Sequence, residues 1–252
     1  MAEARGSGRG KIILLGEHAV VHGEPAIATG LEHDVRVRLL PVGLGSSAAL
    51  SVALVRALAA SDGRALSPSE AARLANEVEK VFHGTPSGID ATTAAHGGLL
   101  WFETGPPMRW EEVAAGGPLP LVVALSGEEH DTGRSVGGLR HRAESSPEVY
   151  GPVFGAIGGL VRAGRTAIER AAWPLLGELM SMNHALLRAC GVSTDALDRV
   201  VDDALACGAL GAKLTGAGGG GAAIALARPE GEEDLIAALR RRGWQAFRAR
   251  SA

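Results

Sequence analysis

Aromatic residues and cysteines are scarce in this chain of 252 residues, and each scarcity argues against a class of protein. Aromatic side chains make up only 4% of the chain, too few to suggest a platform on which nucleic-acid bases could stack. Cysteine occurs only at Cys190 and Cys207, without the spacing of a metal or redox site. Both are therefore expected to be small buried side chains of a protein in a reducing compartment.

The chain also lacks an excess of one charge and any long apolar run. Its 25 basic and 28 acidic residues give a formal net charge of −3, which does not favour nucleic acid as a partner. No apolar run approaches a membrane span, and residues 1–10 are polar and glycine-rich, without a signal-peptide core. With 46% hydrophobic residues, we expect a globular cytoplasmic protein with a full core and no membrane partner.

Lysine is rare among the basic residues, since only Lys11, Lys80 and Lys213 are lysine and the other 22 are arginine. Two of these lysines stand beside glycine-rich segments. A compact ammonium charge is one reason for keeping lysine where arginine is the default, and chance is the other.

Strands dominate the first part of the sequence and helices the second, which predicts an α+β fold in two subdomains. We expect strands at 10–15, 19–21, 25–29, 35–39, 99–102, 121–125, 212–215, 222–227 and 244–248. We expect helices at 48–60, 67–82, 91–96, 148–162, 172–189, 194–206 and 232–242, the second of them started by a Ser67/Glu70 capping box and the third preceded by a loop at 87–90. The glycines and prolines of 116–120 mark the softest boundary, so the predicted domains are 1–118 and 119–252.

Residues 41–49 read Pro-Val-Gly-Leu-Gly-Ser-Ser-Ala-Ala and lead directly into a helical pattern. Gly43 and Gly45 keep the backbone bare, Ser46 and Ser47 supply hydroxyl groups, and the helix start offers free N–H groups. Together they suit a phosphate, although the spacing is not that of a Walker A loop. A plain turn that caps a buried helix is an equal alternative.

Two carboxylates lie at the ends of predicted helices. Glu79 is in the last turn of its helix, where the negative end of the dipole is mildly unfavourable and a bound cation would offset it. Taken alone, a solvated glutamate beside Lys80 is the better interpretation. Asp90 is either an ordinary helix cap or a group that orients a hydroxyl and accepts its proton late, as phosphoryl transfer requires.

Further polar or glycine-rich positions occur at the ends of predicted strands. Glu17 and His18 follow the first strand, and His18 is more typical of a packing or hydrogen-bonding residue than of a metal ligand. Residues 216–221 form a glycine-rich run after Lys213. Such a run is either a hinge or, as we expect here, a place where a ligand or another backbone comes close.

In their order along the chain, these segments resemble the GHMP kinases, and within them the mevalonate kinases. The resemblance lies in residues 11–26, KIILLGEHAVVHGEPA, in 43–49, GLGSSAA, in 83–90, HGTPSGID, and in 213–221, KLTGAGGGG. It implies the two-domain GHMP kinase fold, with an ATP-binding N-terminal domain like domain 2 of ribosomal protein S5 and a ferredoxin-like C-terminal domain. It also implies Mg²⁺, ATP as co-substrate, and phosphorylation of the mevalonate 5-hydroxyl to 5-phosphomevalonate for isoprenoid synthesis.

The resemblance assigns roles residue by residue. It implies that Asp90 is the catalytic base and that Lys11 stabilises charge near the γ-phosphate. It implies that Ser47 and Glu79 hold Mg²⁺. The other implied roles are phosphate binding by Gly43, Leu44, Gly45, Ser46 and Ser47, and substrate binding by Glu17, His18, Thr132 and Gly218.

The chain differs from the family pattern in two places. Leu40 runs almost directly into Pro41, where relatives have several dozen more residues, and Gly133 replaces an arginine that many relatives carry near the substrate. Two alternatives therefore stay open: another GHMP kinase for phosphomevalonate or a sugar, and a non-catalytic GHMP-fold protein that binds a ligand. The sequence does not decide between a monomer and a homodimer.

Overall fold

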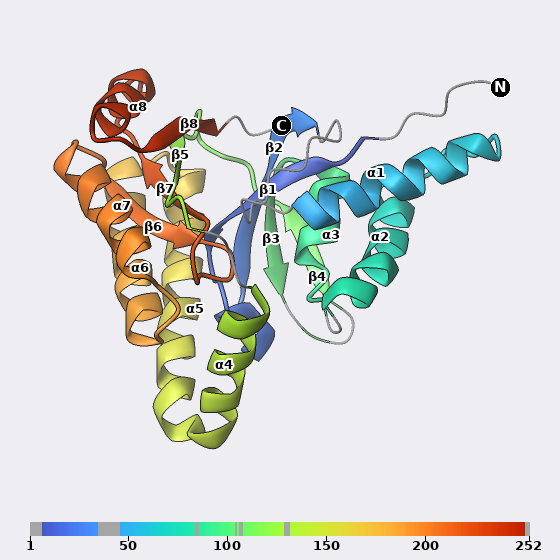
Figure 1. Ribbon diagram of the computed structural model, residues 1–252, viewed down its shortest axis with the longest axis horizontal. Coiled ribbons are helices and arrows are strands. Elements are labelled where there is room, and N and C mark those ends of the chain that lie inside the picture. Colours follow the sequence, from blue (N-terminus) through green and yellow to red (C-terminus); the bar gives the residue numbers. More distant parts are fainter. Residues whose placement is uncertain are drawn as a thin grey trace.

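In a computed structural model, the chain is built on two four-stranded antiparallel sheets with helices packed against them (Figure 1). The structure describes residues 7–34, 46–83, 86–103, 105, 108–128 and 132–249. None of the helices in these ranges combines the length and the apolar character that crossing a membrane requires.

The first sheet has the order β1-β2-β3-β4, and each strand pairs antiparallel with the next. Its strands are β1 (Arg9–Leu15), β2 (Ala26–Asp34), β3 (Leu99–Glu103) and β4 (Arg109–Glu112). Three helices connect β2 to β3: α1 (Ser46–Ser61), α2 (Pro68–His83) and α3 (Ile89–His96). They meet through small side chains such as Ala49, Ala71 and Ala94, all fully buried, so their backbones approach closely.

The second sheet has the order β6-β7-β5-β8, again with antiparallel neighbours only. Its strands are β5 (Leu121–Leu125), β6 (Gly211–Thr215), β7 (Ala222–Leu226) and β8 (Gln245–Ala249). Helices α4 (Thr132–Ser145), α5 (Pro147–Glu169), α6 (Trp173–Ala189) and α7 (Asp195–Ala206) connect β5 to β6, and α8 (Glu232–Arg241) connects β7 to β8. Counted within this half, the strand order is 4-1-3-2, and this is the predicted ferredoxin-like arrangement.

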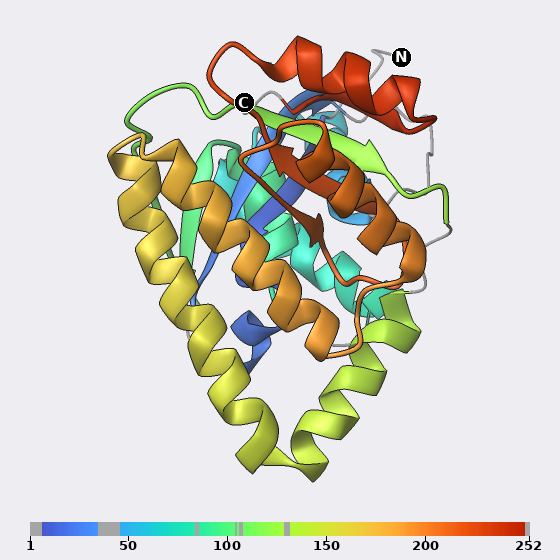
Figure 2. The same cartoon turned by 90° about the vertical axis from the view of Figure 1, so that its left-hand side faces the viewer.

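Strand β1 lies between the two halves of the molecule. Its alternate residues face opposite sides, so that Leu14 joins the large core of the second half while Ile13 joins a smaller core with Phe102. Helices α5 and α6, which run side by side in Figure 2, both contact β1. Along the sequence, the strands of the first sheet come before residues 116–120 and those of the second sheet come after them. One large core contains residues from both halves, so the domain boundary at 118/119 stays a prediction.

The capping box that the sequence predicts at the start of α2 is confirmed. The Ser67 hydroxyl donates to Glu70 Oε2 over 2.7 Å, and the Ser67 N–H donates to the same oxygen over 2.9 Å. Pro68 is the first residue of the helix, where its missing N–H costs nothing.

Three expectations about elements were wrong or incomplete. Residues Ala19–His22 form a short 3₁₀ helix rather than a strand, because Gly16 and His18 have positive φ angles and turn the chain. Helix α4 was missed because its glycines and charges give it a weak helical pattern, and it packs against α5. Strand β4 was missed because it is a short edge strand of mostly charged residues. The strand expected at 35–39 lies outside the described residues.

Candidate active site

Lys11 and Asp90 form an ion pair between the first strand and the third helix. Lys11 lies near the start of β1 with its side chain 5% exposed, and its Nζ is 3.0 Å from Oδ1 of Asp90. Asp90 lies in the first turn of α3, where the helix dipole favours a negative charge, and its side chain is 44% exposed. The N-cap of α3 is Gly88, with a left-handed backbone, so Asp90 is not the helix cap that one interpretation of the sequence suggested. A half-exposed carboxylate next to a fixed ammonium group can accept a proton from a bound hydroxyl.

Glu79 reaches from α2 to the start of α1, where two serine hydroxyls meet it. Ser47 Oγ and Ser51 Oγ each donate to Glu79 Oε1 over 2.7 Å. The side chain of Glu79 is buried, with the residue 4% exposed, so the interpretation as a solvated surface glutamate was wrong. Lys80, its neighbour in sequence, pairs instead with Glu77 over 2.7 Å.

Ser51 is a residue of this site that the sequence analysis missed. It lies one helical turn after Ser47 on the same face of α1, and it is buried. The sequence could have indicated Ser51, because it is a hydroxyl residue four positions after Ser47 in a mostly apolar helix. Because Ser51 also donates to Glu79, the carboxylate keeps this hydroxyl partner when Ser47 binds another group.

The Ser47 and Glu79 oxygens fit a magnesium ion. Mg²⁺ prefers oxygen donors and usually takes one or two carboxylates together with phosphate oxygens and water. Among the described residues, no group of three or more His, Cys, Asp or Glu side chains could hold a metal ion by itself. The Glu79 carboxylate and the Ser47 hydroxyl at the start of α1 would therefore supply only part of the coordination shell, and phosphate oxygens would supply further ligands.

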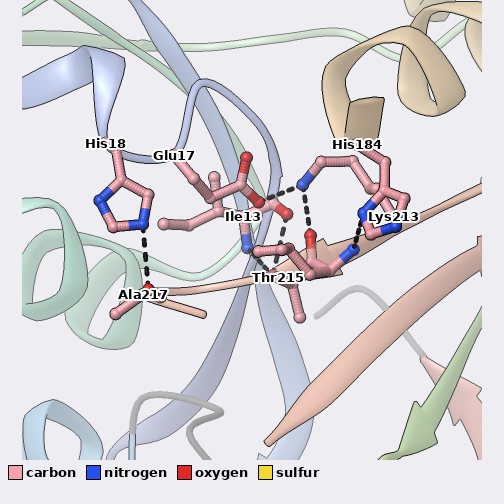
Figure 3. A network of polar contacts seen from close by, with 8 residues as sticks. Ile13, Glu17, His18, His184, Lys213, Thr215 and Ala217 are labelled. Carbon is pink, nitrogen blue, oxygen red and sulfur yellow. Dashed lines mark hydrogen bonds and ion pairs between the residues drawn. The ribbon is translucent and has the colours of Figure 1, made fainter. Parts of the chain in front are cut away.

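Glu17 and Lys213 form a second ion pair, completely buried between the end of β1 and strand β6 (Figure 3). Lys213 Nζ contacts Glu17 Oε1, and it also donates to the Leu214 carbonyl over 2.7 Å. Burial raises the pKa of the Glu17 carboxyl and lowers that of the Lys213 ammonium group, and each charge partly offsets the effect on the other. The charge of Lys11 also lowers the pKa of both groups, and Lys11 lies on β1, the strand that Glu17 follows.

His18 fixes the turn after β1 to the glycine-rich run. Its Nε2 lies 3.0 Å from the carbonyl oxygen of Ala217, as Figure 3 shows. Burial lowers the pKa of His18 to about 4, so the ring is neutral at pH 7 and donates this hydrogen bond through Nε2–H. The expectation of a hydrogen-bonding histidine is confirmed.

The glycine-rich run approaches another backbone closely at Gly218. A Cβ on Gly218 would lie 2.0 Å from the Val192 carbonyl oxygen, and the φ angle of Gly218 is 71°. The N–H of Gly219 donates to the same carbonyl over 2.9 Å. The predicted close approach is therefore confirmed for the protein backbone, while the substrate role of Gly218 stays a prediction.

Several residues that the resemblance assigns to the site cannot be placed. Gly43, Leu44 and Gly45 lie outside the described residues, and so do the side chains of Ser46 and Thr132. The described part brings together Lys11 with Asp90, Ser47 with Glu79, and Glu17 beside His18.

Two family models match the chain. The model described as the GHMP kinases N terminal domain matches residues 21–98, and the one described as GHMP kinases C terminal matches residues 165–244. The chain belongs to the GHMP kinase family.

Its relatives narrow this assignment. The mevalonate kinase of Pyrococcus horikoshii is 34% identical over 308 residues, which cover 91% of this chain and 90% of the relative. The mevalonate kinase of Thermococcus sibiricus is 40% identical over 208 residues, with 80% of this chain and 61% of that relative covered. The crystal structure of L. major mevalonate kinase in complex with R-mevalonate has a TM-score of 0.88 and 26% identity, and covers 100% of this chain and 97% of its own. Within the GHMP kinases the chain belongs with the mevalonate kinases.

The comparison also bears on the short segment before the phosphate loop. An aligned stretch of 308 positions exceeds the 252 residues of this chain, so at least 56 of its positions (308 minus 252) have no counterpart here. This agrees with the shortened region before Pro41.

Proposed function

We propose that this protein transfers the γ-phosphoryl group of ATP to the 5-hydroxyl of mevalonate, and so produces 5-phosphomevalonate and ADP. The observation that carries the chemistry is the 3.0 Å contact between Lys11 and the half-exposed Asp90. The substrate rests on the relatives, since the similar proteins reported above are mevalonate kinases and one of them was crystallised with R-mevalonate.

In this mechanism Asp90 faces the 5-hydroxyl and takes its proton as the oxygen attacks the γ-phosphorus. The new O–P bond forms while the bond from the γ-phosphorus to the bridging oxygen breaks, and the electron pair leaves with ADP. Lys11 lies where it can stabilise the negative charge on the transferring group, because its ammonium is held in a buried position beside Asp90. The proton then passes from Asp90 to solvent, since the carboxylate is half-exposed.

The phosphate end of the site is proposed at the start of α1. Ser47 and Glu79 would hold Mg²⁺, which when bound neutralises charge on the ATP phosphates. Ser51 would keep Glu79 in place from one turn further along the helix. The loop of Gly43, Leu44, Gly45 and Ser46 is proposed to wrap the phosphates, as the resemblance implies.

The substrate end is proposed at the turn after β1. Glu17 and the neutral His18 supply a carboxylate and an imidazole there. Thr132 and Gly218 are proposed to line the rest of the substrate site. A cytoplasmic location is part of the same proposal. It is supported by two cysteines that are both free thiols.

ADP release in the presence of Mg²⁺ and ATP tests this proposal. Mevalonate, phosphomevalonate, homoserine and galactose are compared as acceptors, and mevalonate is expected to give the highest kcat/KM. Turnover of another alcohol without turnover of mevalonate would show a different GHMP kinase. Binding of ATP with no turnover of any acceptor would show a non-catalytic protein. Light scattering on the same sample distinguishes a monomer from a homodimer.

A further inference from the structure

The buried pair of Glu17 and Lys213 leaves one carboxylate oxygen without a partner. Lys213 Nζ contacts Oε1 of Glu17, whereas Oε2 is buried and has no hydrogen-bond partner in the described structure. A charged oxygen kept from both water and donors is costly, so it calls for an explanation. A substrate donor that arrives at this oxygen would provide one.

The position of Glu17 supports a ligand at this oxygen. His18, the next residue, is hydrogen-bonded to the glycine-rich run at Ala217, and Glu17 follows β1, the strand that carries Lys11. Lys11 in turn contacts Asp90, the proposed base. In Figure 3 one oxygen of Glu17 faces Lys213 and the other points away from it. The free oxygen therefore belongs to the neighbourhood of the reacting hydroxyl.

Lys213 is itself held in place. Its Nζ donates to the Leu214 carbonyl over 2.7 Å as well as to Glu17, and its side chain is 0% exposed. It is one of only three lysines among 25 basic residues. A single compact ammonium group suits this buried position, because a guanidinium group is larger and has five N–H donors to satisfy.

We propose that Lys213 is a positioning residue for substrate recognition, which holds Oε1 of Glu17 so that Oε2 accepts a hydrogen bond from the hydroxyl that does not react. This rests on the proposed function, under which the substrate is a dihydroxy acid. Its 5-hydroxyl faces Asp90, and its carboxylate is repelled by Glu17, so the 3-hydroxyl is the remaining donor. Lys213 touches neither substrate nor nucleotide in this arrangement and acts through Glu17.

The experiment compares mevalonate with 5-hydroxy-3-methylpentanoate, which lacks the 3-hydroxyl. The wild-type protein is expected to prefer mevalonate in kcat/KM by about 10- to 100-fold, the range of a hydrogen bond to a charged group. Lys213→Met is expected to lose most of this preference while the KM for ATP stays unchanged. Because Lys213→Met leaves a buried carboxylate alone and is expected to destabilise the fold, Glu17→Gln/Lys213→Met is measured beside it.

The matched control is Thr215→Val on the same strand. Thr215 is buried and its hydroxyl both donates to the Ile13 carbonyl and accepts from the Ile13 N–H over 3.0 Å, so the variant weakens the same junction without touching Glu17. Urea unfolding is expected to show reduced stability for Thr215→Val, with the preference for mevalonate intact.

The outcomes separate the two proposals. If the wild-type protein does not turn over mevalonate, the proposed function fails. If it turns over both acceptors equally well, the function stands and the inference about Lys213 is wrong. A Glu17→Gln/Lys213→Met variant that retains the full preference would show that the pair is only structural. Equal loss of preference in Thr215→Val would also overturn the inference.

Discussion

The ammonium group of Lys11 lies 3.0 Å from Oδ1 of Asp90, and this contact joins the buried first strand to a half-exposed side chain in the first turn of helix α3. The strand fixes the cation, and the left-handed backbone at Gly88 sets where α3 begins. The two charges therefore have different tasks, one held inside the protein and one presented to a substrate.

Asp90→Ala is expected to reduce turnover of mevalonate by at least about 100-fold, because it removes the proton acceptor. Binding of a non-hydrolysable ATP analogue, measured by calorimetry, should be largely unchanged, since the base does not hold the nucleotide. Asp62→Ala, in the exposed turn after α1, serves as the control and should keep full turnover. Near-wild-type activity of Asp90→Ala would contradict the assigned role.

Lys11→Met is expected to lower kcat by about 100- to 1,000-fold, as the loss of a fixed charge near the transferring group does. The chain offers Lys80→Met as a matched control, because Lys80 is half-exposed and pairs with the exposed Glu77. Steady-state kinetics should show a change for Lys11 alone. Similar losses for both lysines would point to a general effect of charge rather than to a site.

Ser51→Ala is expected to weaken metal-dependent nucleotide binding by about 10-fold, the size expected when an outer partner of a metal ligand is lost. Of the two serine hydroxyls that donate to Glu79 Oε1, the remaining one would be that of Ser47, which the metal is proposed to use. Calorimetric titration of Mg²⁺ into the protein with an ATP analogue measures this without turnover. Ser61→Ala, at the exposed end of the same helix, should bind like the wild type. Equal affinity in Ser51→Ala would exclude this role for Ser51.

We expect the protein to lose stability in acid, because His184 is buried and uncharged in the folded state at neutral pH. Burial lowers the pKa of His184 to about 4, although its Nε2 lies 3.3 Å from Asp198. Between about pH 4 and 6.5 the unfolded chain binds a proton that the folded chain does not, so unfolding becomes easier as the pH falls. One such histidine contributes at most about 3 kcal/mol over this window.

Urea unfolding at pH 7 and pH 5 tests this expectation. His184→Gln should reduce the loss of unfolding free energy between the two pH values, and His141→Gln, on the exposed side of α4, should not. An unchanged difference in His184→Gln would mean that other groups cause the acid sensitivity.

Gly218→Ala is expected to cost more stability than a left-handed backbone alone explains. A left-handed alanine costs about 1–2 kcal/mol, and this is all that Gly243→Ala should lose, because its φ is 93° and no atom lies within 4 Å of its Cβ. Gly218→Ala should lose clearly more, since its Cβ would lie 2.0 Å from the Val192 carbonyl oxygen. Equal losses, measured by urea unfolding, would mean that the glycine-rich run moves aside freely.

What could be predicted from the sequence depends on the distance over which each interaction acts. The capping box of Ser67 and Glu70 spans three residues, so it was visible in the sequence and is confirmed. The pattern of apolar residues also predicted β5 with its bounds unchanged. In contrast, the apolar residues of Ala19–His22 suggested a strand, and the segment is a short 3₁₀ helix. Its conformation is set by the backbone turn at Gly16 and His18, which the pattern of apolar side chains does not reveal.

The sequence by itself determined the family, the candidate base Asp90 and the candidate metal residue Ser47, since these depend on motifs that are continuous in the chain. Glu79 lies outside these motifs and was assigned through the resemblance to the family. Only the tertiary structure decided that Glu79 is buried beneath two serine hydroxyls and that Lys213 reaches Glu17. Those partners are separated by 28 to 196 residues in sequence. Local preferences cannot bring them together, because packing of helices and sheets against a shared core sets which distant side chains meet.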